Sequence, residues 1–224
     1  MTQLEYKRHF DHIIERVEKA RLRLSDHHIV KIVAASKYVD TEAIKTLYAI
    51  GQRAFGENKV QDLLTKSQKL EEIPLEWHFI GTLQKNKINH LLSIRPYLVH
   101  SIDSLELAQA LNERLERDGI TMRALVQINS AYEASKSGFL PEEVTDKYAQ
   151  IAEECPRLQL QGVMSIGAHT EDISIITKSF ETTRRIFDTL PNANICSMGM
   201  SGDFERAIEC GSTMIRLGSI LFPK

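Results

Sequence analysis

The sequence has few cysteines and no long apolar run. Its three cysteines, Cys155, Cys196 and Cys210, are odd in number, far apart and without a Cys-x-x-Cys pair. This spacing excludes a disulfide framework and a zinc knuckle, and it indicates a reducing compartment. No apolar stretch approaches the roughly 20 residues that a membrane-spanning helix needs. We therefore expect a cytoplasmic protein without membrane contacts.

The sequence also lacks a strong charge of one sign. Its 28 Lys and Arg and 30 Asp and Glu give a formal net charge of −2, which offers no charge-driven reason to expect a nucleic-acid partner. The 11 Gly and 6 Pro are too few for a low-complexity scaffold, and 42% hydrophobic residues are typical of a globular protein. None of the histidines lies in an H-E-x-x-H pattern, so we expect no metal site.

The first 25 residues predict an amphipathic helix. Within 2–24, one helical face carries the apolar residues Phe10, Ile13, Ile14, Val17 and Leu24, and charged residues surround it. A signal peptide would instead have a continuous apolar segment. We therefore expect a leading helix that packs on the rest of the domain.

The remainder alternates between strand and helix patterns. Predicted strands span 29–36, 53–56, 77–80, 97–102, 123–128, 158–166, 195–198 and 214–217, and predicted helices span 41–50, 59–70, 85–94, 104–118, 141–154, 173–190 and 204–209. Asp40 or Thr41 is the expected cap of the first of these helices, and Asp103 or Ser104 that of the fourth. Such βα units imply a parallel sheet.

Eight βα units predict an α/β fold, a single (β/α)8 TIM barrel over residues 1–224. An open doubly wound sheet is the alternative. Its dinucleotide-binding loop, Gly-x-Gly-x-x-Gly, does not follow the first predicted strand. A barrel places its active site at the carboxyl ends of its strands, where Lys37, Asn58, His78, Ser165 and Arg216 are the candidate polar residues.

Lys37 follows the first predicted strand. By the period of two, Val33, Ala35 and Lys37 share a face, and the small alanine leaves room for a ligand. A desolvated lysine amine is neutral more often and can form a Schiff base with a carbonyl. An ordinary exposed lysine is the alternative.

Two Gly/Ser turns follow the last two predicted strands. Ser201 and Gly202 precede a short helix, and Gly218 and Ser219 follow Arg216. These loops of a barrel are a frequent phosphate site, and a helix start adds free N–H groups. Two tight turns with a helix cap are the alternative. For His78, in an apolar strand, the alternatives are a ligand contact and a half-buried side chain with a backbone partner.

Several segments together resemble a known family, the pyridoxal-phosphate homeostasis proteins, whose fold matches the barrel domain of alanine racemase. The segments are VAASK (33–37), FGEN (55–58), HFIGTLQKNK (78–87), KSG (136–138), GVMSI (162–166), MGMSGD (198–203) and IRLGS (215–219). Ser219 stands where the family often has Thr, and relatives often continue beyond residue 224 with a basic tail.

The resemblance implies that the chain carries pyridoxal 5′-phosphate as a Schiff base on Lys37. It also implies that Ser201, Gly218 and Ser219 hold the phosphate, that Arg216 faces the pyridine nitrogen, and that Asn58 and His78 lie near the ring. From the resemblance and the strand ends together, the predicted cofactor-binding residues are Lys37, Asn58, His78, Ser165, Ser201, Gly202, Arg216, Gly218 and Ser219.

The same resemblance implies a role in vitamin B6 and amino-acid homeostasis. An arginine beside the pyridine nitrogen disfavours ring protonation, which weakens the cofactor as an electron sink. Alanine racemase also takes a second base from a further domain, and this sequence ends with the barrel. We therefore expect a monomeric carrier without robust catalysis or catalytic residues, which passes the cofactor to apo-enzymes. The alternative is a pyridoxal-phosphate-dependent racemase or lyase whose second base is Lys136, His78 or a tyrosine.

Overall fold

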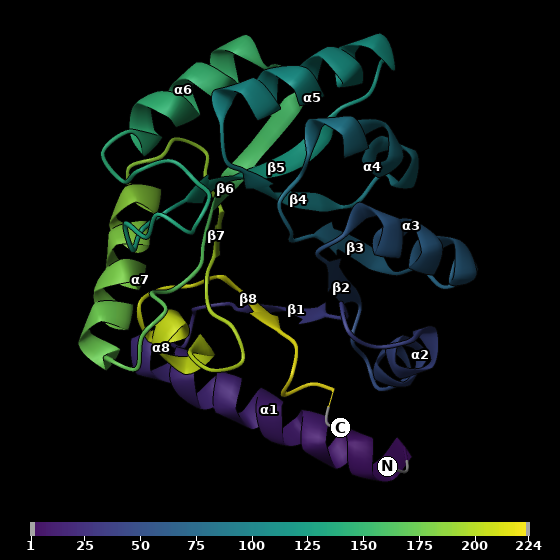
Figure 1. Cartoon of the computed structure of the whole chain (residues 1–224). Coiled ribbons are helices and arrows are strands. Elements are labelled where there is room, and N and C mark those ends of the chain that lie inside the picture. The colour runs from purple at the N-terminus through teal and green to yellow at the C-terminus, as the bar shows by residue number, and fades with distance from the viewer. Residues whose placement is uncertain (1–2, 223–224) are drawn as a thin grey trace.

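The computed structural model describes residues 3–222 and shows a closed barrel of parallel strands ordered β1 to β8 (Figure 1). Parallel pairing of β8 with β1 closes the barrel and places Val33 opposite Arg216. The predicted barrel is thereby confirmed over the open doubly wound sheet. The strands are β1 (Lys31–Ala35), β2 (Ala54–Glu57), β3 (Glu76–Phe79), β4 (Leu98–Ile102), β5 (Met122–Ile128), β6 (Leu158–Ser165), β7 (Ile195–Ser197) and β8 (Met214–Leu217).

The helices surround the barrel in Figure 1. They are α1 (Gln3–Leu24), α2 (Thr41–Ala49), α3 (Val60–Lys69), the 3-10 turn η1 (Lys85–Lys87), α4 (Ile88–Ile94), α5 (Leu105–Arg117), α6 (Val144–Glu154), α7 (Ile173–Phe187) and α8 (Phe204–Glu209). Two predicted caps are confirmed. Asp40 Oδ1 accepts from the N–H of Ala43 at 2.9 Å, and Ser104 Oγ accepts from the N–H of Leu107 at 3.3 Å.

Several details of the sequence prediction are wrong. Helix α7 ends at Phe187 and not at Leu190. Helix α6 begins at Val144 and not at Pro141, because 140–143 form a turn in which Glu143 N–H donates to the Leu140 carbonyl. Strand pairing begins at Lys31, and Ile29 is 81% exposed. Leu24, at the end of α1, is 44% exposed and lies off the buried face of that helix.

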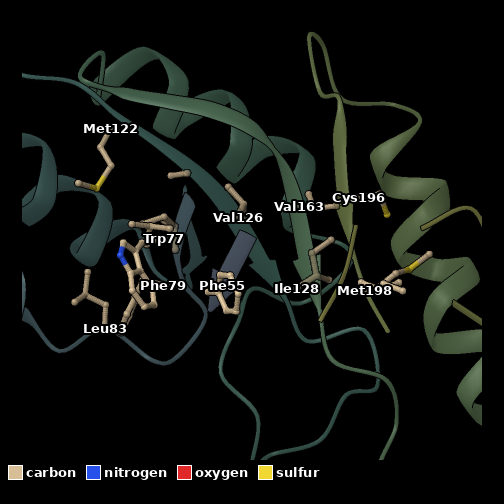
Figure 2. Packing of buried hydrophobic residues seen from close by; sticks show 14 of the residues in the cluster. Phe55, Trp77, Phe79, Leu83, Met122, Val126, Ile128, Val163, Cys196 and Met198 are labelled. Atoms are coloured by element: carbon tan, nitrogen blue, oxygen red, sulfur yellow. The ribbon is translucent and has the colours of Figure 1, made fainter. Parts of the chain in front are cut away.

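The strand side chains form two apolar layers because they alternate between the two faces of the barrel wall. Inward-facing residues, among them Val33 and Leu125, make a small interior cluster. Outward-facing residues pack between strands and helices, and Figure 2 shows part of this layer. Within it, the Phe55 and Trp77 rings meet with centroids 6.3 Å apart. Side chains of both layers therefore fix the strand ends that carry the site.

Helix α1 packs beside α8 at one side of the barrel, along the lower edge of Figure 1. The Arg16 guanidinium donates to both carboxylate oxygens of Glu205, at 3.0 and 2.9 Å, and lies over the Phe204 ring. Ile13 and Val17 are buried on the same face. The predicted leading helix is thus part of the outer layer. Within residues 3–222, no helix has the length and apolar character to cross a bilayer.

Candidate functional site

Lys37 lies in the turn that follows β1. The strand ends at Ala35, and Val33 belongs to the interior cluster, so the predicted inward face is confirmed for Val33. The Lys37 side chain is half-buried, and its Nζ lies 4.9 Å from the centre of the Tyr38 ring. Among residues 3–222 it makes no hydrogen bond or ion pair. Its amine is therefore available to a ligand.

A buried cluster holds the backbone just before Lys37. Ser36 Oγ donates to Glu57 Oε1 at 2.6 Å, and Lys66 Nζ donates to the same oxygen and to the Ser36 carbonyl, both at 2.7 Å. Glu57 is fully buried at the end of β2. This cluster ties the Lys37 turn to β2 and α3. Sequence reasoning missed it, although a glutamate that ends an apolar strand, nine residues before a lysine, was a usable signal.

The loops after β7 and β8 meet at Ser201 and Gly218, where the Gly218 N–H donates to Ser201 Oγ at 3.1 Å. Gly218 also lies against the end of β1, since a Cβ added there would be 3.4 Å from the Ala35 carbonyl oxygen. The structure thus brings the two predicted Gly/Ser turns together, close to the strand that leads to Lys37. Gly202 and Ser219 are exposed beside them.

The turn that contains Ser201 is closed by Asp203. Its Oδ1 accepts from the N–H of Met200 at 2.6 Å, just before α8. Burial raises the pKa of Asp203, against the opposing effect of its backbone hydrogen bond and of the Arg216 and Lys136 charges. The Asp203 carboxylate thus closes the turn with a hydrogen bond between neighbouring residues.

Arg216 points into the barrel from β8. Its Nη1 donates to Ser197 Oγ at 2.7 Å, and its Nη2 donates to the Ser165 carbonyl at 2.8 Å. Burial lowers its pKa to about 10, although Asp203 and Cys196 act in the opposite direction. The side chain is therefore cationic near neutral pH. Its hydrogen-bond partners among residues 3–222 are neutral oxygens, and three of its five N–H bonds are unused there.

The other predicted residues lie around Arg216 or on the next loops. Ser165 ends β6, supplies a carbonyl to Arg216, and accepts at Oγ from Thr183 Oγ1 at 2.8 Å. Asn58 is half-buried after β2. The loop after β3 presses on it so closely that a Cβ on Gly81 would lie 2.0 Å from the Asn58 carbonyl oxygen. Only glycine fits there, and it fixes the position of Asn58.

His78 is fully buried inside the barrel. Its Nε2 lies 2.7 Å from Glu76 Oε1, and its Nδ1 lies 2.9 Å from His100 Nε2. Both ring nitrogens thus contact side chains, so the expectation of a half-buried ring with a backbone partner is wrong. Sequence reasoning did not identify Glu76 or His100 as its neighbours.

Lys136 joins two loops at the rim of the barrel. Its Nζ donates to Glu133 Oε1 at 2.8 Å and to the Gly167 carbonyl at 2.6 Å. The side chain is largely buried in these contacts. Within the described part of the chain, no three side chains of the metal-binding types group together.

The chain matches the family described as "Alanine racemase, N-terminal domain" over residues 9–223. A pyridoxal phosphate homeostasis protein of Helicobacter pylori is 57% identical over 98% of this chain and 99% of its own length. The protein of the same name from Bos taurus is 37% identical over 86% of this chain and 76% of its own length.

Two solved structures extend this similarity. PipY of Synechococcus elongatus, with PLP bound, superposes with a TM-score of 0.80 at 30% identity, and the match covers 93% of this chain and 98% of that one. An alanine racemase of Clostridium difficile has a TM-score of 0.72 at 19% identity, over 93% of this chain and 55% of that one, which shows the fold alone. The chain therefore belongs to the alanine racemase N-terminal domain family and, within it, to the pyridoxal phosphate homeostasis proteins.

Proposed function

We propose that this chain binds pyridoxal 5′-phosphate at the carboxyl ends of the barrel strands and holds it through a Schiff base on Lys37. The observation that carries the proposal is the PLP bound to PipY, a structure that matches this chain over nearly its whole length. Lys37 makes no hydrogen bond or ion pair within residues 3–222, so its amine can provide the nucleophile that such a bond needs. The cluster of Ser36, Glu57 and Lys66 supports the turn that presents it.

The phosphate would bind where the loops after β7 and β8 meet. Ser201 offers a hydroxyl, Ser219 another, and Gly202 a backbone N–H group, while the Gly218 N–H, which bonds Ser201 Oγ, would orient the Ser201 hydroxyl. A Cβ on Gly202 would meet no atom within 4 Å, so there is open space on that side of the loop. This loop pair is the frequent phosphate site of barrels of this kind.

Arg216 would face the pyridine nitrogen. A guanidinium only donates hydrogen bonds, so it favours an unprotonated nitrogen and a weaker electron sink. Its unused N–H bonds fit this role. Asn58 would lie beside the ring. Ser165 and His78 would contribute from behind Arg216, the first through its carbonyl and the second through intervening side chains.

We further propose that the protein stores and supplies the cofactor in vitamin B6 homeostasis and does not itself turn over amino acids. The relatives that carry the homeostasis name match the chain over most of their length. Lys136 and His78, our candidate second bases, already have hydrogen-bond partners. His78 is also fully buried, which separates it from a substrate at the strand ends.

The alternative is a pyridoxal-phosphate-dependent racemase or lyase, which the family match to the alanine racemase N-terminal domain favours. Exchange of the α-hydrogen of amino acids with solvent deuterium separates the two. A carrier exchanges it no faster than free pyridoxal phosphate does. Exchange at enzyme-like rates that Lys37→Ala abolishes would overturn the carrier role.

We also propose that the chain is a monomeric, single-domain protein of the cytoplasm and that it passes the cofactor to apo-enzymes. The family match over 9–223 supports one functional unit. If direct contact mediates the transfer, its rate saturates as the acceptor apo-enzyme is increased. Transfer no faster than spontaneous release would contradict direct delivery. Light scattering gives the oligomeric state.

A spectroscopic titration tests the binding site. Pyridoxal phosphate added to the wild-type protein should give the visible absorbance of a Schiff base, and Lys37→Ala should not. Lys59→Ala is the matched control, because Lys59 is an exposed lysine after the next strand. Equal spectra for the two variants would refute the role of Lys37.

A further inference from the structure

A column of polar side chains crosses the interior of the barrel. It runs from Glu76 Oε1 to His78 Nε2 (2.7 Å), from His78 Nδ1 to His100 Nε2 (2.9 Å), and from His100 Nδ1 to Ser197 Oγ (3.2 Å). Ser197 Oγ then accepts from Arg216 Nη1 at 2.7 Å. The two histidines and Ser197 are fully buried. The remaining interior positions include the apolar cluster of Val33, Ala54, Leu98, Leu125, Met164 and Met214.

The column links the two ends of the barrel. Glu76 begins β3, is partly exposed, and pairs with Lys31 at the start of β1. Lys31 and Tyr97 border a surface cavity of about 370 Å³ at this end. Arg216 is at the other end of the column, near the carboxyl ends of the strands.

The chemistry of the two terminal groups gives the column a direction. A guanidinium can only donate and an ionised carboxylate can only accept. His78 therefore donates from Nε2 to Glu76, and a neutral His78 accepts at Nδ1 from His100 Nε2–H. A neutral His100 then accepts at Nδ1 from the Ser197 hydroxyl, which leaves Ser197 Oγ to accept from Arg216. Every bond points from the cation to the carboxylate.

The charge states agree with this direction. Burial lowers the pKa of His78, although Glu76 acts to raise it. Burial, with repulsion from Arg216 and from His78 when that ring is protonated, lowers the pKa of His100 well below its usual value. Burial acts to raise the pKa of Glu76, but hydrogen bonds from His78 and Lys31 outweigh it, and the net shift is downward. These shifts make both histidines neutral at neutral pH, between an ionised Glu76 and a cationic Arg216.

We propose that His100 and His78 are positioning residues that, through Ser197, fix the guanidinium of Arg216 in the orientation that receives the cofactor ring. The inference rests on the proposed function, since Arg216 is there assigned to the pyridine nitrogen. The column holds Arg216 from the side opposite the strand ends, and Ser165 holds its second nitrogen. Because the guanidinium is already oriented, the cofactor ring can bind without a rearrangement of Arg216.

The first test uses the ligand-free protein and ¹⁵N NMR of the imidazole side chains. We expect His78 and His100 to carry one proton each, on Nε2, and to stay neutral between about pH 6.5 and 8. Exposed His90 supplies the reference signals of a ring that faces solvent. A proton on Nδ1 of either buried ring, or a charged ring at neutral pH, would overturn the directed column.

The second test compares Ser197→Ala with Ser179→Ala. Both replace a buried serine, but Ser179 on α7 bonds the Ile176 carbonyl of its own helix, outside the column and the proposed cofactor site. Ser197→Ala should weaken pyridoxal phosphate binding about tenfold, the effect of one hydrogen bond to a charged group, and should shift the absorbance of the bound cofactor. Ser179→Ala should bind as the wild type does. Equal affinity and spectra in the two variants would overturn the positioning role.

The two tests separate this inference from the proposed function. If the wild type fails to bind pyridoxal phosphate, the proposed function is wrong, and the NMR experiment still decides whether the directed column exists. If the wild type binds and the two serine variants behave alike, the site stands and the positioning role is wrong. If Ser197→Ala does not fold, the tautomers of the wild-type protein decide the matter.

Discussion

Replacing Lys66 by methionine should destabilise the fold by about 3 kcal/mol. Lys66 pairs with Glu57 at 2.7 Å, and the two side chains are 13% and 0% exposed. Methionine keeps the apolar stem but leaves the carboxylate buried without its cation, and removing one partner of a buried pair costs about 3–5 kcal/mol. The remaining bond from Ser36 favours the lower value. At about 2–4 °C per kcal/mol for a chain of this size, the melting temperature should fall by about 6–12 °C.

Urea unfolding followed by circular dichroism measures this loss. Lys69→Met is the matched control, since Lys69 is exposed on the same helix and its replacement should change the free energy of unfolding by less than about 0.5 kcal/mol. The double variant Glu57→Gln/Lys66→Met should recover most of the loss, because no buried charge remains. A Lys66→Met protein as stable as Lys69→Met would refute the reasoning.

Three further predictions follow from the site and the interior. Ser201→Ala should lower pyridoxal phosphate affinity by about 1.5–3 kcal/mol in a fluorescence titration, and unchanged affinity would contradict the phosphate placement. Burial lowers the pKa of His78 and His100 in the folded state, so the unfolded chain binds more protons below about pH 6.5. The free energy of unfolding should therefore stay constant above that pH and fall as the pH drops towards 5. Urea unfolding at several pH values measures it, and a free energy that does not change with pH would contradict this. Burial raises the pKa of Cys196 to about 12 and of Cys210 to about 11. The native protein should therefore react slowly with Ellman's reagent and the unfolded protein rapidly, and fast labelling of the native protein would contradict the burial.

Most of the fold could be predicted because the strand and helix periods are local. The bounds of α8 (Phe204–Glu209) and β8 (Met214–Leu217) agree with the prediction residue by residue. The start of α6 could not be predicted, since Pro141 suits a turn as well as a first helical turn. The exposure of Leu24 and Ile29 could not be predicted either, because burial depends on which other segments pack against a residue, and the local sequence does not specify these segments.

The site was predictable where a rule of the fold applied. Lys37, Ser201 and Gly218 stand at strand ends, and the structure brings the last two into contact. The interior column was not predictable in the same way. His100 stands in a buried strand, and its partners His78 and Ser197 lie 22 and 97 residues away in sequence. Only barrel closure brings them together.

Borohydride reduction of the protein loaded with pyridoxal phosphate, followed by peptide mass mapping, tests the central claim most directly. Reduction makes a Schiff base permanent and marks the lysine that formed it. We predict one pyridoxyl group per chain, on the peptide that contains Lys37. A label on another lysine, or no label after loading and reduction, would contradict the account.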